Sequence, residues 1–257
     1  MKKIILTLFV IVSFNSFAGI TIVSDLDDTI KITNSGKEVD ATINAFFTKY
    51  VFVLIPEFFK AASDYSNELH VVSASPFILK NKVDETFKKH QINVDSLVLR
   101  NPFDGQSKLE FKVGVIKAMM EKTSDDFIFL GDDVGQDPEV YAELNRHFPS
   151  RVLATYIHVI KGRKLPEKST PYWTSYDLYL REYIAGRMPR SQVEAAAEKM
   201  LTDLDMKLVI PGFANCPKTP AVWLWQLPTI FFNSSRAIIS KLNKYCVSDH
   251  SDNFVAE

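Results

Sequence analysis

Residues 20–29 read Ile20-Thr21-Ile22-Val23-Ser24-Asp25-Leu26-Asp27-Asp28-Thr29, an apolar segment that continues directly into the pattern Asp-x-Asp-x-Thr. The apolar part predicts a short buried β-strand, and the carboxylates of Asp25 and Asp27 follow at its carboxyl end. Open α/β sheets bind their ligands at this end of their strands. Because two buried anions do not stabilise a strand, the pattern favours a site for magnesium-assisted phosphoryl transfer. The alternative is a solvated acidic turn that follows a strand.

Short β-branched segments alternate with longer amphipathic ones from residue 20 onward. They predict strands at 20–24, 69–73, 96–99, 127–130 and 152–159. Between these strands they predict helices at 42–63, broken before Pro56, and at 77–90, 109–122 and 139–148. Strands separated by helices of this length form parallel βαβ units with right-handed crossovers. We therefore expect an α/β fold, a three-layer sandwich with about five parallel strands.

The pattern changes after Gly162. Residues 163–171 are polar and contain two prolines, and the stretches 174–185 and 191–205 predict helices. A loop at 211–220 and an aromatic-rich segment follow, and we expect residues 247–257 to be frayed. The expected organisation is a signal peptide at 1–18, an α/β domain at 19–164, and a helical C-terminal extension at 165–257 that packs on it.

The N-terminal segment has the features of a secretory signal. Two lysines precede an apolar run over residues 4–12, and small residues stand at Ser16 and Ala18. The run is too short to span a bilayer. We expect cleavage after Ala18 and an exported bacterial protein, periplasmic or secreted. The alternative is an uncleaved anchor.

The two cysteines, Cys216 and Cys246, could form one bridge in an oxidising compartment, and we favour a disulfide over two free thiols. The formal net charge of −1 provides no global field that would attract nucleic acid. A local basic cluster at residues 161–168 either attracts anionic lipid or is a solvated loop, which we favour. The aromatic segment with Trp223 and Trp225 is interpreted as packing on the sandwich rather than as a membrane anchor.

Four polar groups follow successive predicted elements. Asp25 and Asp27 follow the first strand, Ser73 closes the second, and Lys112 lies in the helix after the third. The segment 131–138, Gly-Asp-Asp-Val-Gly-Gln-Asp-Pro, follows the fourth. Each alone has a structural interpretation: a capping serine, a solvated lysine, an acidic turn. In a parallel sheet, however, all of them converge at one edge, so we expect a shared site.

This ordered set resembles the haloacid dehalogenase superfamily of aspartate-nucleophile phosphohydrolases. Three strings, at 24–31, 73–76 and 131–141, are similar to the catalytic domain of the actin-patch-associated phosphatidate phosphatases. The resemblance spans about residues 20–163. The chain departs from the family pattern at Phe77 and His158, where we expect tryptophan and arginine.

The resemblance implies how the acidic residues act. Asp25 would attack phosphorus and form an aspartyl-phosphate, and Asp27 would protonate the leaving oxygen and then activate water. Crowding by Asp25 and Asp132 would raise the pKa of Asp27. Magnesium would be held by the Asp25 carboxylate, the Asp27 backbone carbonyl and Asp132. Asp133 and Asp137 would support these ligands from outside the coordination sphere.

The resemblance also implies the residues that contact substrate. Ser73, Ala74 and Lys112 would bind the phosphoryl oxygens, and Thr29 would shape the turn above the metal. Only about 40 residues separate Thr29 from the second strand, and the predicted helix takes up most of them. We therefore expect no large cap domain and an open site.

The expected function is that of a magnesium-dependent phosphomonoesterase that acts on phosphatidate-like lipid phosphates. The expected partners are a phosphorylated lipid or small phosphate ester and a transient membrane surface, with no nucleic acid. One alternative is a periplasmic phosphatase for small soluble phosphate esters. Another is a non-catalytic phosphate- or lipid-binding module, and a phosphotransferase or phosphoprotein phosphatase also stays open.

Overall fold

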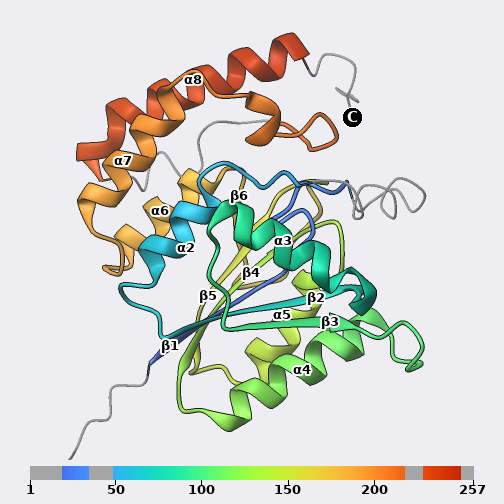
Figure 1. The fold of residues 1–257 in the computed structure, drawn as a ribbon. Coiled ribbons are helices and arrows are strands. Elements are labelled where there is room, and N and C mark those ends of the chain that lie inside the picture. The colour runs from blue at the N-terminus through green and yellow to red at the C-terminus, as the bar shows by residue number, and fades with distance from the viewer. Residues whose placement is uncertain (1–18, 35–48, 218–227, 250–257) are drawn as a thin grey trace, which may run out of the picture.

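The computed structural model describes residues 19–34, 49–217 and 228–249, which form a layered α/β fold (Figure 1). Within them, six parallel strands make one sheet in the order β3-β2-β1-β4-β5-β6. The strands are β1 Ile20–Ser24, β2 Glu68–Pro76, β3 Ser96–Arg100, β4 Asp126–Asp132, β5 Val152–His158 and β6 Thr170–Tyr172. The three-layer prediction and all five predicted strands are confirmed. The sixth strand was missed because it is three residues long with a central proline, which only an edge strand tolerates.

Helices cover both faces of the sheet. One face carries α4 Lys108–Lys122 and α5 Asp137–His147. The other carries α2 Ile55–Ala62, α3 Lys80–His90 and α6 Ser175–Ile184. Outside α6 lie α7 Arg190–Leu201 and α8 Phe232–Asp249 (Figure 1). We call the three helices α6, α7 and α8 the C-terminal helical layer. Short 3₁₀ turns are η1 Phe77–Leu79, η2 Met206–Leu208 and η4 Thr229–Phe231.

The core is divided by the sheet, because successive strand residues point to opposite faces. Ile22 of β1 packs in the core beneath α2, α3 and α6, while the next residue, Val23, packs beneath α4 and α5. In the second core the ring of Phe129 stacks on Tyr141 of α5 at 4.8 Å. Burial on both faces explains why the strands read as nearly continuous apolar runs.

Two predicted helices have different bounds in the structure. The first was expected to include residues 49–54, but α2 begins at Ile55 after Leu54, whose backbone is left-handed at φ 71°. Residues before it are extended, because Val51 pairs with Lys31 and the Phe52 N–H donates to the Ile30 carbonyl. The part of this prediction at 42–48 lies outside the described residues. The second, α7, ends at Leu201 rather than at residue 205.

The C-terminal layer was only coarsely predicted. Helix α8 continues to Asp249, so the expected fraying does not begin at residue 247. A disulfide joins Cys216, in the loop after η2, to Cys246 on α8, with their Cα atoms 6.0 Å apart. Trp223, Trp225 and the predicted signal segment lie outside the described residues. Among the helices that the structure describes, none combines the length and apolar character required to cross a bilayer.

Candidate active site

The turn after β1 presents two aspartates at the carboxyl edge of the sheet. The Asp25 N–H donates to the Leu130 carbonyl at 2.8 Å, so this residue still pairs with β4. The chain then turns through Asp28, which adopts a left-handed conformation with φ 57°. One carboxylate oxygen of Asp28 accepts the N–H groups of Thr33 and Asn34, both at 2.9 Å. Asp28 therefore fixes the turn that carries Asp27.

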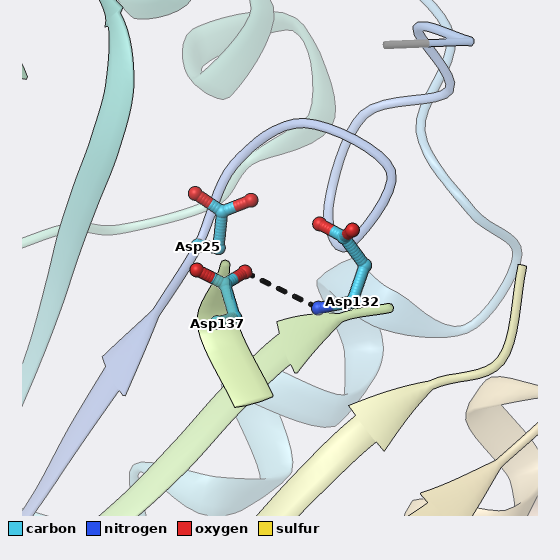
Figure 2. A group of neighbouring side chains, drawn as sticks. All are labelled: Asp25, Asp132 and Asp137. Carbon is cyan, nitrogen blue, oxygen red and sulfur yellow. Dashed lines mark hydrogen bonds between the residues drawn. The ribbon is translucent and has the colours of Figure 1, made fainter. Parts of the chain in front are cut away.

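Three buried carboxylates lie together at this edge (Figure 2). Oxygens of Asp25, from the end of β1, Asp132, from the end of β4, and Asp137, from the start of α5, lie within 4.8 Å of one another. Asp132 Oδ1 accepts the N–H groups of Val134 at 2.6 Å and Gly135 at 3.0 Å. The Asp132 N–H in turn donates to Asp137 Oδ2 at 3.3 Å. The loop between β4 and α5 thus holds two of the three carboxylates in place.

Lys112 reaches this carboxylate group from α4. Its Nζ donates to Asp25 Oδ1 at 2.7 Å and to Asp137 Oδ1. Although burial opposes its charge, the carboxylates of Asp137 and Asp25 raise the pKa of Lys112, so the ammonium stays charged. Burial first, and then Asp137, raise the pKa of Asp25 to about 7 against the opposing effect of Lys112. Burial and the neighbouring carboxylates likewise raise the pKa of Asp132.

This charge balance fits a hard divalent cation. Among the described residues, the carboxylates of Asp25 and Asp137 contact the ammonium of Lys112, and the candidate ligand atoms of all three carboxylates are oxygens, which Mg²⁺ and Ca²⁺ prefer. An added cation would relieve the burial of uncompensated negative charge that raises the carboxylate pKa values. The structure brings together Asp25 and Asp132, the predicted ligands. It also brings Asp137, expected outside the coordination sphere, into the same group.

Asp27 lies on a different side of the turn and contacts two serines of β2. Ser73 Oγ donates to Asp27 Oδ2 at 3.3 Å, and Ser75 Oγ donates to the same oxygen. Burial raises the pKa of Asp27, and the hydrogen bond from Ser75 and the nearby Lys31 lower it again in part. Desolvation is therefore the main cause of the raised pKa, whereas the prediction ascribed it to crowding by Asp25 and Asp132.

Ser75 was missed by sequence reasoning, although a signal was present. It lies two residues after Ser73, and alternate residues of a strand face the same side. The Ser75 N–H also donates to Ser73 Oγ at 3.0 Å, which orders the end of β2 where its pairing with β3 shifts register. Ala74 lies between the two serines and is half-buried.

Two other predicted residues occupy distinct positions. Thr29 is buried, and its Oγ1 has no hydrogen-bond partner among the described residues. Asp133 does not join the carboxylate group; it accepts four backbone N–H groups from the loop after β5. The donors are Ile160 and Lys161, both at 2.7 Å, Gly162 at 2.6 Å and Arg163 at 3.0 Å. Asp133 thus positions the loop after β5.

His158 connects the turn after β1 to the C-terminal part of the chain. Its Nδ1 lies 2.8 Å from the Asp28 carbonyl oxygen, and its Nε2 lies 3.2 Å from that of Trp173. The ring stacks on Tyr172 at 4.8 Å, and burial lowers its pKa. A scattered histidine gave no sequence signal for this role, because the contact joins residues 130 positions apart.

Residues 20–159 match the catalytic domain of phosphatidate phosphatase APP1. An uncharacterized protein of Schizosaccharomyces pombe is 26% identical over 192 residues, covering 64% of this chain and 32% of that protein. The chain therefore spans about a third of that relative's length. Two chains from structures of the Pnkp1/Rnl/Hen1 complex, one described as an RNA repair complex, are each 16% identical.

Those two structural similarities are low. The first has a TM-score of 0.41 and covers 54% of this chain and 45% of that chain. The second has a TM-score of 0.40 and covers 62% and 44%.

Proposed function

Because the chain belongs to the family of phosphatidate phosphatase APP1 catalytic domains, we propose that it is a magnesium-dependent phosphomonoesterase that uses an aspartyl-phosphate intermediate. The observation that carries this proposal is the position of Asp25. Its carboxylate contacts Lys112 and lies beside the carboxylates of Asp132 and Asp137. Two residues later, Asp27 lies on the serine-lined side of the same turn. The residues that we propose as nucleophile, proton donor and cation ligands thus lie at one edge of the sheet.

The proposed reaction proceeds in two steps that share these residues. In the first, an Asp25 carboxylate oxygen forms a bond to phosphorus while the bond to the leaving oxygen breaks, and Asp27 gives that oxygen its proton. In the second, the oxygen of a water molecule forms a bond to phosphorus and gives a proton to Asp27, while the bond between the Asp25 oxygen and phosphorus breaks, which releases phosphate and restores the Asp25 carboxylate. The raised pKa of Asp27 favours the protonated form that the first step requires.

The remaining residues would neutralise and orient the phosphoryl group. We propose that Mg²⁺ is held by Asp25, Asp132 and the Asp27 carbonyl, with Asp137 beside them. The bound Mg²⁺ would supply positive charge to the phosphoryl oxygens. Lys112 would hold Asp25 in the attacking orientation through its hydrogen bond. We assign Ser73, Ala74 and Lys112 to contacts with phosphoryl oxygens, and Thr29 to the turn above the metal.

The proposed substrate is a phosphatidate-like lipid phosphate, in agreement with the family. We assign the chemistry to residues 19–164 and treat residues 165–257 as the helical extension. We also propose that the protein is exported, periplasmic or secreted, after cleavage behind Ala18. The leader-like segment and the Cys216–Cys246 disulfide, which an oxidising compartment permits, support this location.

The test is phosphate release from phosphatidate in mixed micelles and from a soluble aryl phosphate, with magnesium and with chelator. Asp25→Asn is expected to lower the rate at least about 10³-fold, because it removes the nucleophile. Asp84→Asn, at an exposed aspartate paired with Lys80, is the matched control and should keep the parent rate. Metal-dependent release from the lipid supports the proposal. Release from the aryl phosphate alone would retain the chemistry for small soluble esters, and no release from either would reject it.

A further inference from the structure

Two groups of exposed side chains flank the candidate active site at the carboxyl edge of the sheet. We define the apolar tip as Phe77, Ile78 and Phe103, which are 48%, 64% and 86% exposed. We define the basic loop as residues 161–168, which follow β5. The apolar tip follows β2 and β3, whereas the aspartates extend from β1 and β4, in the middle of the sheet order. The site therefore lies between the two groups.

The apolar tip is formed by two adjacent chain segments. Pro76 at the end of β2 pairs with Arg100 at the end of β3, so η1 and the loop before α4 leave neighbouring strands. That loop protrudes from the edge of the sheet (Figure 1). The Phe103 N–H donates to Asn101 Oδ1 at 3.1 Å, which orders the turn that exposes the ring. Single exposed apolar residues are ordinary, but these three follow the ends of two paired strands.

The basic loop is ordered and its cations face outward. It contains four basic residues and one acidic residue, Glu167. The Asp133 carboxylate holds the backbone N–H groups at the start of the loop. Arg163 pairs with Glu139 at 2.8 Å, and the described residues offer no salt bridge to the exposed Lys161, Lys164 or Lys168. The loop therefore presents uncompensated positive charge beside the site.

We infer that a lipid bilayer surface bearing anionic headgroups docks on this edge, with the apolar tip inserted and the basic loop against the headgroups. A flat, laterally extended partner contacts both groups at once, although a buried site separates them. Aromatic and aliphatic side chains favour the interfacial zone, and lysines favour an anionic surface. Asp104 follows Phe103 in the chain, and Lys108 follows four residues later. Because these two residues carry opposite charges, the tip is close to neutral and would bind by apolar insertion.

This inference deepens the proposed function and rests on it for the identity of the substrate, since docking would present a membrane-held phosphate to Asp25. The docking itself involves none of the residues assigned to chemistry. Vesicles without phosphatidate therefore test the surface separately from catalysis.

The experiment measures co-sedimentation of the purified protein, recovered after expression of the full chain, with two kinds of vesicle. One kind is phosphatidylcholine alone, and the other also contains phosphatidylglycerol. The tip variant is Phe77→Ser/Ile78→Ser/Phe103→Ser, and the loop variant is Lys161→Gln/Lys164→Gln/Lys168→Gln. The matched control, Leu153→Ser/Ile184→Ser, replaces exposed apolar residues outside the apolar tip, one near the start of β5 and one at the end of α6. Hydrolysis of a soluble aryl phosphate and circular dichroism report on folding of each variant.

The tip variant is expected to bind both vesicles at least about tenfold more weakly, because apolar area no longer enters the interface. The affinity of the loop variant should fall roughly fivefold for each lysine replaced, and only for vesicles that contain phosphatidylglycerol. The control should stay within roughly twofold of the parent.

The inference would be overturned if the parent bound neither kind of vesicle, or if the tip variant bound vesicles as tightly as the parent. So would a parent dimer that dissociates in the tip variant without any vesicle binding, because the partner would then be a second copy. A parent that binds vesicles but hydrolyses no ester would reject the proposed function and leave the docking surface standing.

Discussion

At the scale of single residues, the site depends on close approach as much as on charge. Gly131 separates the strand interior from Asp132, and a Cβ there would lie 2.6 Å from Asp137 Cβ and 2.7 Å from Tyr141 Cε2. Tyr141 in turn donates from its hydroxyl to the Leu130 carbonyl at 2.7 Å. The absence of a side chain at this glycine therefore allows the start of α5 to bring Asp137 against β4.

We expect Gly131→Ala to destabilise the protein by about 1–3 kcal/mol, since an added methyl must displace packed atoms. The displaced Asp137 should also weaken magnesium-dependent hydrolysis. The matched control is Gly114→Ala in α4, where an added Cβ meets no atom within 4 Å. That change should stabilise an exposed helix position by about 0.5–1 kcal/mol. Urea unfolding measures both variants, and equal stability of the two would refute the packing argument.

At the scale of elements, the carboxyl ends of strands are organised by side chains that accept backbone N–H groups. Asp28 does this for the turn after β1, Asp132 for the loop before α5, and Asp133 for the loop after β5. Loops that leave a sheet lose the ladder partners of their backbone groups. A buried carboxylate replaces those partners, so the acidic character of this edge is partly structural.

Asp133→Asn tests the structural part of this acidity. The amide retains one acceptor oxygen but presents an NH₂ group toward backbone donors, leaving N–H groups of the loop unpaired. We expect a loss of about 1–3 kcal/mol in the free energy of unfolding. Hydrogen exchange at residues 160–163 should accelerate. Asp104→Asn, at an exposed residue that accepts a single N–H from Gln106, should change stability by less than about 0.5 kcal/mol. Unchanged exchange at 160–163 would contradict the assigned role.

At the scale of the whole molecule, the C-terminal helical layer is fastened to the sheet at several points. Buried Glu182 of α6 accepts hydrogen bonds from Tyr156 of β5 and from Arg187, the latter at 2.6 Å. His158 connects the turn after β1 to Trp173 at the start of this region. The disulfide closes a segment of 30 residues between Cys216 and Cys246. The layer is thus an integral part of the core on one face.

Opening the disulfide should lower the free energy of unfolding by about 2–4 kcal/mol, because the bridge restricts the unfolded chain. For a protein of this size the expected fall in Tm is roughly 5–15 °C. The variant is Cys216→Ser/Cys246→Ser, measured by thermal unfolding with and without reductant. Reductant should lower the Tm of the parent and leave that of the variant unchanged. A parent whose Tm is insensitive to reductant would argue against a stabilising bridge.

Part of the fold and site could be read from local pattern. Apolar runs of about five residues, separated by amphipathic stretches, predicted five parallel strands joined by helices. Asp25 was identified because it follows such a run directly, whereas Asp132 was singled out by the family resemblance of the segment after the fourth strand. Two features were not predicted correctly. Strand β6 was missed because it has only three residues. Residues 49–54 were predicted to be helical, but tertiary contacts pair them with the turn after β1.

The sequence by itself determined five of the six described strands, the sheet edge that carries the candidate site and the polar groups that follow the strands, because periodicity and strand ends are local properties of the chain. Only the tertiary structure decided which partners those polar groups contact. Asp137 lies with Asp25 and Asp132, Asp133 accepts N–H groups of the loop after β5, and Ser75 donates a hydrogen bond to Asp27. It also placed His158 beneath the turn after β1. These contacts join distant segments, and their partners are set by packing across the sheet rather than by spacing along the chain.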